Sequence, residues 1–255
     1  MKDEYKKSNC YCNRRRFRSG RCGGKSIAEG GANVIILDTN IELSEVTAKQ
    51  IGATAIKCDV SNETSVEQAI SILKQRFGLP RVLVNCAGIG GSARIVGKEG
   101  PLSLVDFEKV IRVNLVGTFN MIRLVAAEMI QTEPMQDQER GVIISTSSVA
   151  AFEGQIGQAA YAASKGGITS LTLPAAREFA QFGIRVNTIA PGLFMTPLLH
   201  GLSDEAQKSL AASIPFPKRL GGAEEFADLV LHLIQNRYIN GEVIRIDGAL
   251  RMQPK

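Results

Sequence analysis

The chain of 255 residues is 44% hydrophobic and 22% charged. This ordinary globular composition excludes disordered and fibrous proteins, and the length allows one large domain with its own core. The formal net charge is +5 at pH 7, and five positive charges lie close together near the N-terminus. Without them the rest of the chain is neutral; they belong to Arg14, Arg15, Arg16, Arg18 and Arg21.

Composition also bears on location. No apolar run reaches the ~18 residues of a membrane-spanning helix, and the first nine residues lack the apolar core of a secretory signal. The five cysteines, an odd number at low density, favour reduced thiols in a cytosol-like compartment. We therefore expect a cytoplasmic protein without a membrane partner; the mitochondrial matrix stays open for a eukaryotic source.

From Ala32 onward, short apolar runs alternate with amphipathic segments. This alternation favours parallel strands joined by right-handed crossovers. We predict one doubly wound α/β domain of the Rossmann type over residues 1–255, with helices on both faces of a parallel sheet. The expected strands are 34–38, 53–58, 81–85, 141–146, 184–189 and 243–246, and the expected helices are 41–51, 61–77 with Ser61 as N-cap, 104–129, 159–182 and 224–235.

The carboxyl ends of the predicted strands carry polar residues and glycine loops. In doubly wound sheets, ligands bind at these ends. The clustering therefore predicts a ligand site at one edge of the sheet, formed by Asp38, Asp59, and residues 85–88, 147–148 and 191–192.

Three residues have the spacing of an acid–base site. Tyr161 and Lys165 lie four residues apart on a predicted helix and share a face, and Ser148 ends an earlier strand. A tyrosine of pKa about 10 is a poor catalyst at neutral pH, but a nearby ammonium lowers its pKa. A lone Tyr-x-x-x-Lys pair is usually a surface pair; the serine and the strand-end aspartates favour proton exchange with an alcohol or ketone.

These motifs, with Asn114 and residues 191–192, resemble the short-chain dehydrogenase/reductase family in order and spacing over residues 25–255. The resemblance implies that Tyr161 is the general acid/base and that Lys165 lowers its pKa and binds the nicotinamide ribose. It implies that Ser148 positions the substrate oxygen and that Asn114 helps to hold a proton-relay water. It also implies cofactor contacts at Asp59, Val60, Cys86, Ala87, Gly88, Phe194 and Thr196.

Within the family, three stretches and one insert are similar to the type 2 3-hydroxyacyl-CoA dehydrogenase subgroup: residues 148–155, 190–194, 240–245 and the insert 132–140. This similarity implies oxidation of a 3-hydroxyacyl-CoA with NAD, a homotetramer, and a substrate contact at Gln155.

Asp38 bears on the choice of cofactor. A carboxylate at the end of the second strand accepts hydrogen bonds from ribose hydroxyls and repels a 2′-phosphate, which favours NAD over NADP. The alternative is that Asp38 only caps the following helix. Two other functions stay open: an NADPH-dependent 3-oxoacyl reductase, and a catalytically impaired relative with a scaffolding or binding role.

The family's first strand and its Thr-Gly-x-x-x-Gly-x-Gly turn are missing before Asp38. Glycines in that turn let the backbone approach the pyrophosphate. Residues 9–24 instead read NCYCNRRRFRSGRCGG, which is neither a buried apolar strand nor a glycine turn. A zinc site at Cys10, Cys12 and Cys22 explains these residues poorly, because no histidine is near and the cysteine spacing fits no common finger. An arginine-rich arm for nucleic acid explains them less well than the shifted reading frame given next.

A compensated frameshift over residues 8–24 explains the charge, the cysteines and the missing turn together. Reading the next frame from Lys7-Ser8 permits Ala-Ile-Ala-Ile-Val-Thr-Gly-Gly-Ala-Ser-Gly-Leu-Gly-Ala-Ala-Ala-Ala, and the frame returns at Lys25. That peptide is a hydrophobic strand followed by the glycine loop. As the sequence stands, long arginine side chains occupy positions that need glycine, so we expect weak or absent NAD binding, and neither a metal site nor a nucleic-acid partner.

Overall fold

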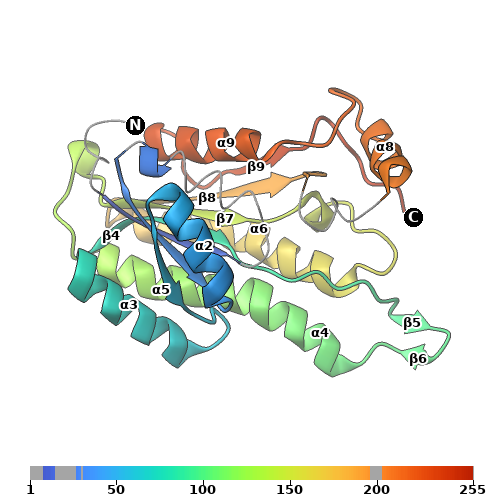
Figure 1. The fold of residues 1–255 in the computed structure, drawn as a ribbon, viewed down its shortest axis with the longest axis horizontal. Helices are drawn as coiled ribbons and strands as arrows, with labels where there is room; N and C mark the ends of the chain where they lie inside the picture. Colours follow the sequence, from blue (N-terminus) through green and yellow to red (C-terminus); the bar gives the residue numbers. More distant parts are fainter. Residues whose placement is uncertain (1–7, 15–26, 30, 196–202, 255) are drawn as a thin grey trace.

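The computed structural model describes residues 8–14, 27–29, 31–195 and 203–254, with only the main chain for residues 13 and 14. Seven parallel strands form one sheet in the order β3-β2-β1-β4-β7-β8-β9. Helix α9 covers one face, while α3, α5 and α6 cover the other (Figure 1). The predicted single doubly wound domain is confirmed.

The six predicted strands all form, and their ends differ from the prediction by at most two residues. They are readable from the sequence because both faces of the sheet are covered, which makes each strand a nearly continuous apolar run. In β8 every residue is buried. The strands are β2 Asn33–Asp38, β3 Thr54–Lys57, β4 Pro80–Cys86, β7 Gly141–Thr146, β8 Ile184–Pro191 and β9 Val243–Ile246.

The predicted helices also form: α2 Ile41–Ile51, α3 Glu63–Phe77, α4 Leu104–Ile111 continuing into α5 Gly117–Met129, α6 Ala159–Ala180 and α9 Ala223–Gln235. The prediction of Ser61 as the N-cap of α3 is wrong. Asn62 caps the helix, since its Oδ1 accepts a hydrogen bond from the Ser65 amide at 2.9 Å. The Ser61 hydroxyl instead donates to Asp59 Oδ1 at 2.6 Å.

The long helix that contains α4 and α5 is one continuous element. Among the described residues, Leu104–Met129 is the single helix long and apolar enough to cross a membrane, and 56% of its most apolar stretch is buried inside the fold. It packs against α6 and β4. This packing is that of a core helix.

Several elements were not predicted. The hairpin of β5 Val96–Gly97 and β6 Gly100–Pro101 projects from the sheet beside α4 (Figure 1). Helix α8, Asp204–Ala212, was also not predicted; it has no fully buried residue, and Leu210 packs against the small cluster of Ile214, Leu220 and Leu250.

Strand β1, Asn9–Arg14, lies between β2 and β4 in the middle of the sheet. Cys10 and Tyr11 are fully buried there, and burial raises the pKa of the Cys10 thiol to about 12. The prediction that this stretch is not a buried strand is therefore wrong: residues 9–14 form a strand, and residues 9–12 are buried. The rest of the segment expected to replace the glycine loop, residues 15–24, lies outside the described residues.

The polar groups of β1 are satisfied where the strand begins. The Asn9 side-chain amide donates to the carbonyl oxygens of Phe77 at 2.6 Å and Leu79 at 3.1 Å. The Tyr11 hydroxyl donates to Gly78 O at 3.3 Å. These bonds to the end of α3 let a polar segment enter the core without leaving donors unpaired.

Candidate active site

Ser148 and Tyr161 meet at the carboxyl end of β7. Ser148 follows the strand and starts the short 3-10 turn Val149–Ala151, where its Oγ accepts from the Ala150 amide at 3.1 Å. Tyr161 lies in the first turn of α6 and shares a hydrogen bond with Ser148, which lowers the tyrosine pKa. The predicted pair of hydroxyl groups is thus in contact.

Lys165 lies one helical turn further along α6 and is buried. Its Nζ donates to Thr146 O at 2.7 Å and lies 5.8 Å from the centroid of the Tyr161 ring. Burial lowers the pKa of Lys165 to about 8. Lys165, the third predicted catalytic residue, therefore lies beside the other two. The sequence could not predict its bond to Thr146 O, because any residue at position 146 has that carbonyl oxygen.

The direction of the tyrosine shift differs from the prediction. Burial raises the pKa of Tyr161, and this effect exceeds the lowering by Ser148. The net direction is set by burial of the ring, while the predicted lowering of the tyrosine pKa by Lys165 stays a prediction.

Asn114 is fully buried and ties two parts of the site together. Its side chain exchanges hydrogen bonds with the main chain of Ile89, at 2.7 Å and 2.9 Å, and donates to Ser164 Oγ at 3.0 Å. Ser164 in turn donates to Tyr161 O at 2.7 Å. Asn114 therefore links the loop after β4 to the first turn of α6.

A π-helical turn, Arg112–Val116, places Asn114 in this position. Such turns occur frequently at functional sites. The Thr118 hydroxyl donates to Asn114 O at 2.6 Å, which satisfies a carbonyl within the irregular turn.

The loop after β4 carries Cys86, Ala87 and Gly88. A Cβ on Gly88 would lie 3.3 Å from Asn114 Oδ1 and 3.6 Å from Lys165 Nζ. The Cys86 thiol accepts from Thr146 Oγ1 at 3.5 Å. Glycine at residue 88 thus lets the main chain of this loop approach Asn114 and Lys165 closely.

A hollow lies at the ends of β2, β3 and β4. Asp59 and Val60 both line it, and so does Ala87 from the loop after β4. Its lining residues are Leu37, Thr39, Cys58, Asp59, Val60, Ala87 and Val113.

Asp38 lies beside this hollow, at the end of β2. Its Oδ1 accepts from the Asn40 amide at 2.9 Å and from Thr39 Oγ1 at 3.5 Å. The alternative that Asp38 is the cap of α2 is wrong, because Asn40 is the N-cap and accepts from the Leu43 amide at 3.0 Å.

The hollow and the loop at Gly88 both lie at the carboxyl ends of the strands, where doubly wound sheets bind ligands. A dinucleotide cofactor is expected along this edge, with its adenosine end against Asp59 and Val60 and its other ribose near Lys165.

Three further predicted contacts have different outcomes. The Phe194 ring is buried against Phe226, with 6.4 Å between centroids, so a cofactor contact at Phe194 is left to its main chain. Thr196 lies outside the described residues. Gln155 lines a hollow of about 370 Å³, together with Arg94, Ile95, Val96, Gly154, Ile156, Gly157, Gln158, Ala159 and Ala162.

Comparisons with known proteins agree with this geometry. Residues 20–250 match the family model described as enoyl-(acyl carrier protein) reductase. A curated relative from Bos taurus, named 3-hydroxyacyl-CoA dehydrogenase type-2, is 53% identical over 228 residues, which cover 88% of this chain and 87% of the relative.

Two solved structures are also similar. The 3-hydroxyacyl-CoA dehydrogenase type-2 from Mycobacterium avium is 41% identical, with a TM-score of 0.95 and complete coverage of both chains. The 3-ketoacyl-(acyl-carrier-protein) reductase from Brucella melitensis, complexed with NADH, is 29% identical, with a TM-score of 0.87 over 97% of this chain and 99% of that chain.

Proposed function

Because the chain belongs to the short-chain dehydrogenase/reductase family of oxidoreductases, we propose that it oxidises a secondary alcohol with NAD, converting 3-hydroxyacyl-CoA to 3-oxoacyl-CoA. The observation that carries this proposal is the meeting of Ser148, Tyr161 and Lys165 beside the glycine loop at Gly88. The names of the similar proteins support the choice of an acyl substrate.

In the proposed mechanism, Ser148 Oγ binds the substrate hydroxyl and holds it against Tyr161 Oη. The tyrosine accepts the hydroxyl proton, and Lys165 Nζ stabilises the phenolate while it contacts the nicotinamide ribose. NAD, when bound, supplies the acceptor for the hydride that leaves the substrate carbon. Asn114 keeps the loop and α6 in register, and would hold the relay water through which the proton leaves.

The test is formation of NADH from a 3-hydroxyacyl-CoA at a series of pH values. Since burial raises the pKa of Tyr161, the phenolate forms more readily as the pH rises, and the oxidation rate should increase toward alkaline pH. Folded, NAD-saturated protein that yields no NADH at any pH would contradict the proposal and favour the scaffolding role.

The preference for NAD over NADP rests on Asp38, whose carboxylate would repel a 2′-phosphate. We expect Asp38→Ser to lower the affinity for NAD and so to reduce the difference in affinity between NAD and NADP. The alternative function, reduction of a 3-oxoacyl substrate with NADPH, predicts the opposite preference in the same assay.

We also propose that residues 8–24 are a compensated frameshift in the gene or in its recorded sequence. The family match begins at residue 20, after most of this stretch, which supports the idea. Sequencing the DNA across codons 5–27 tests it directly. Codons that cannot encode the shifted peptide would refute it.

A matched pair of proteins tests the physical consequence. Calorimetry should find weak or absent NAD binding in the chain as it stands, and micromolar binding when residues 8–24 are replaced by the shifted peptide, because the glycine loop is restored. Equal micromolar affinity in both proteins would contradict this expectation.

The proposed assembly is a homotetramer. An apolar hollow of about 450 Å³ lies between α5 and α6, and Phe119 and Leu173 on these helices are 48% and 44% exposed. Burying such a surface between copies stabilises an oligomer. Light scattering should give the mass of a tetramer, and Phe119→Glu should give a smaller assembly.

A cytoplasmic location remains a prediction.

A further inference from the structure

The C-terminal segment, residues 251–254, lies against the loop 152–158 that connects Ser148 to Tyr161. The Ile156 amide donates to Pro254 O at 3.0 Å, and the Gln155 side-chain amide donates to Gln253 O at 2.9 Å. The last residues of the chain therefore fix the loop between two catalytic side chains.

Glu153 is the centre of this contact. Its two carboxylate oxygens accept from the Arg245 guanidinium at 2.7 Å and 3.2 Å, and Oε2 also accepts from the Met252 amide at 3.1 Å. Arg251 Nε lies 3.3 Å from Glu153 Oε1. One carboxylate thus joins the loop, β9 and the C-terminal segment.

Arg245 is itself held in place. Its Nε donates to Asp247 Oδ2 at 2.7 Å, and its guanidinium lies 5.2 Å from the centroid of the Phe152 ring. The Glu153 and Arg245 side chains are 24% and 21% exposed. A bidentate, half-buried pair of this kind is stronger and more directional than an exposed one.

The loop also lines the hollow of about 370 Å³ that contains Gln155, the residue predicted to contact the substrate. The Ala93 amide donates to Gly157 O at 2.9 Å, which anchors the loop to the segment after β4. Ile95, Val96 and Ile156 border the hollow with half or more of their side-chain surface exposed. The same loop therefore lines the hollow and bonds to the C-terminal segment.

We propose that Glu153 is a positioning residue for substrate binding. By holding the C-terminal segment on the loop 152–158, it sets the shape of the hollow that receives the non-reacting part of the substrate. Glu153 touches none of the reacting groups, so its effect falls on KM. The inference rests on the proposed function for the identity of the substrate.

The first test is Glu153→Gln, which keeps the side-chain size and removes the charge. We expect KM for the 3-hydroxyacyl-CoA to rise about tenfold, with kcat and the affinity for NAD unchanged. Hydrogen exchange should become faster at the Ile156 and Met252 amides. If the chain as it stands binds NAD too weakly, the same change is made in the protein with the restored loop.

A second variant ends the chain at Leu250. It keeps the pair of Glu153 and Arg245 but removes the segment that the pair holds, and we expect the same rise in KM and faster exchange in the loop. Glu225→Gln is the matched control, because Glu225 forms a bidentate pair with Arg219 outside this contact. The control should leave KM and loop exchange unchanged.

The outcomes separate the two proposals. Absence of turnover in NAD-saturated protein, with the glycine loop restored where needed, contradicts the proposed function, while loop exchange still decides the role of Glu153. Normal turnover with an unchanged KM in both variants overturns the positioning role. Unchanged loop exchange in both variants overturns it as well.

Discussion

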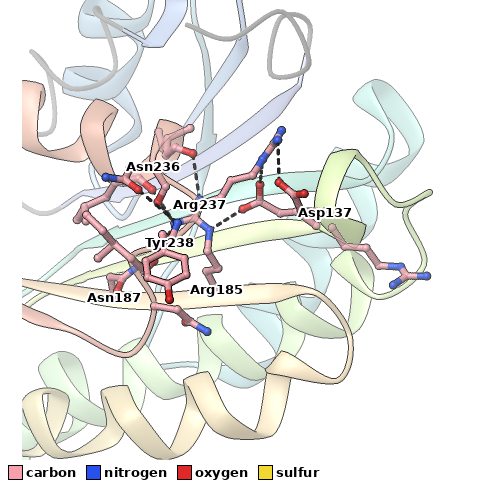
Figure 2. Close-up of polar contacts among 12 residues, drawn as sticks. Asp137, Arg185, Asn187, Asn236, Arg237 and Tyr238 are labelled. Atoms are coloured by element: carbon pink, nitrogen blue, oxygen red, sulfur yellow. Dashed lines mark hydrogen bonds and ion pairs between the residues drawn. The ribbon is translucent and has the colours of Figure 1, made fainter.

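Both ends of the sheet contain buried charged side chains, but the partners of these side chains differ. At the carboxyl end, Lys165 is buried with its Nζ on a main-chain oxygen. At the opposite end, the Arg185 guanidinium and the Glu139 carboxylate are buried together, with 2.6 Å between them, and Arg237 Nε donates to the same carboxylate at 2.8 Å (Figure 2).

Arg185 also stabilises the end of a helix. Its guanidinium donates to Leu233 O at 2.7 Å and Ile234 O at 3.0 Å, in the last turn of α9. A cation at this end satisfies free carbonyls and the helix dipole. The comparison teaches that a buried charge with charged partners serves the fold, whereas a buried ammonium held by a neutral carbonyl keeps a perturbed pKa and is available for chemistry.

The largest expected effect is at the carboxyl end. Tyr161→Phe removes the proton acceptor, and kcat should fall by roughly 10³- to 10⁴-fold. The melting temperature should change little, because the ring stays in place. The measurement pairs NADH formation with thermal unfolding; a variant that retains most of its turnover would remove tyrosine from the mechanism.

The opposite end should show the reverse pattern. Arg185→Met leaves the Glu139 carboxylate buried with less compensation and should lower the free energy of unfolding by about 3–5 kcal/mol. The kcat of the molecules that remain folded should be unchanged. Arg123→Ala, which breaks an exposed pair with Glu63, is the control and should cost less than about 1 kcal/mol.

Lys165→Met tests whether burying the lysine ammonium lowers the free energy of unfolding. The native lysine loses its proton near pH 8, whereas an unfolded lysine keeps it up to about pH 10.5. The free energy of unfolding of the parent should therefore rise relative to the variant between these pH values, by on the order of 3 kcal/mol. Urea unfolding of both proteins at pH 7 and pH 10 measures the difference, and parallel curves would contradict it.

The smallest effect concerns an exposed pair. Arg219 and the Gly222 amide lower the pKa of Glu225 to about 2. This carboxylate stabilises the fold at pH values above its unfolded pKa of about 4.5, and the contribution is lost as the pH falls toward 2. Because the pair is exposed, Glu225→Gln should cost less than about 1 kcal/mol at pH 7, and nothing below pH 2.

Much of the fold was predictable because the sheet is covered on both faces. Strands such as Gly141–Thr146 are continuous apolar runs, and the prediction gives their ends correctly. The hairpin Val96–Gly97 and Gly100–Pro101 is too short for any periodicity. Strand β1 was missed because Asn9 and Tyr11 are satisfied by the end of α3, a contact that the local sequence cannot show.

The site was predictable where side chains alone define it. Ser148, Tyr161 and Lys165 share a spacing that only a helix next to a strand end brings together, and they do meet. The direction of the Tyr161 shift was not predictable, because it depends on how much of the fold covers the ring. The contact of Gln155 with Gln253 joins residues far apart in the chain, and no local pattern reveals it.

The position of β1 has a consequence for synthesis. β1 precedes both of its neighbours in the chain, so its hydrogen bonds can form only after β4, which ends at Cys86, has been made. In the chain as it stands, Cys10 and Cys12 therefore become buried only when the middle of the sheet has formed.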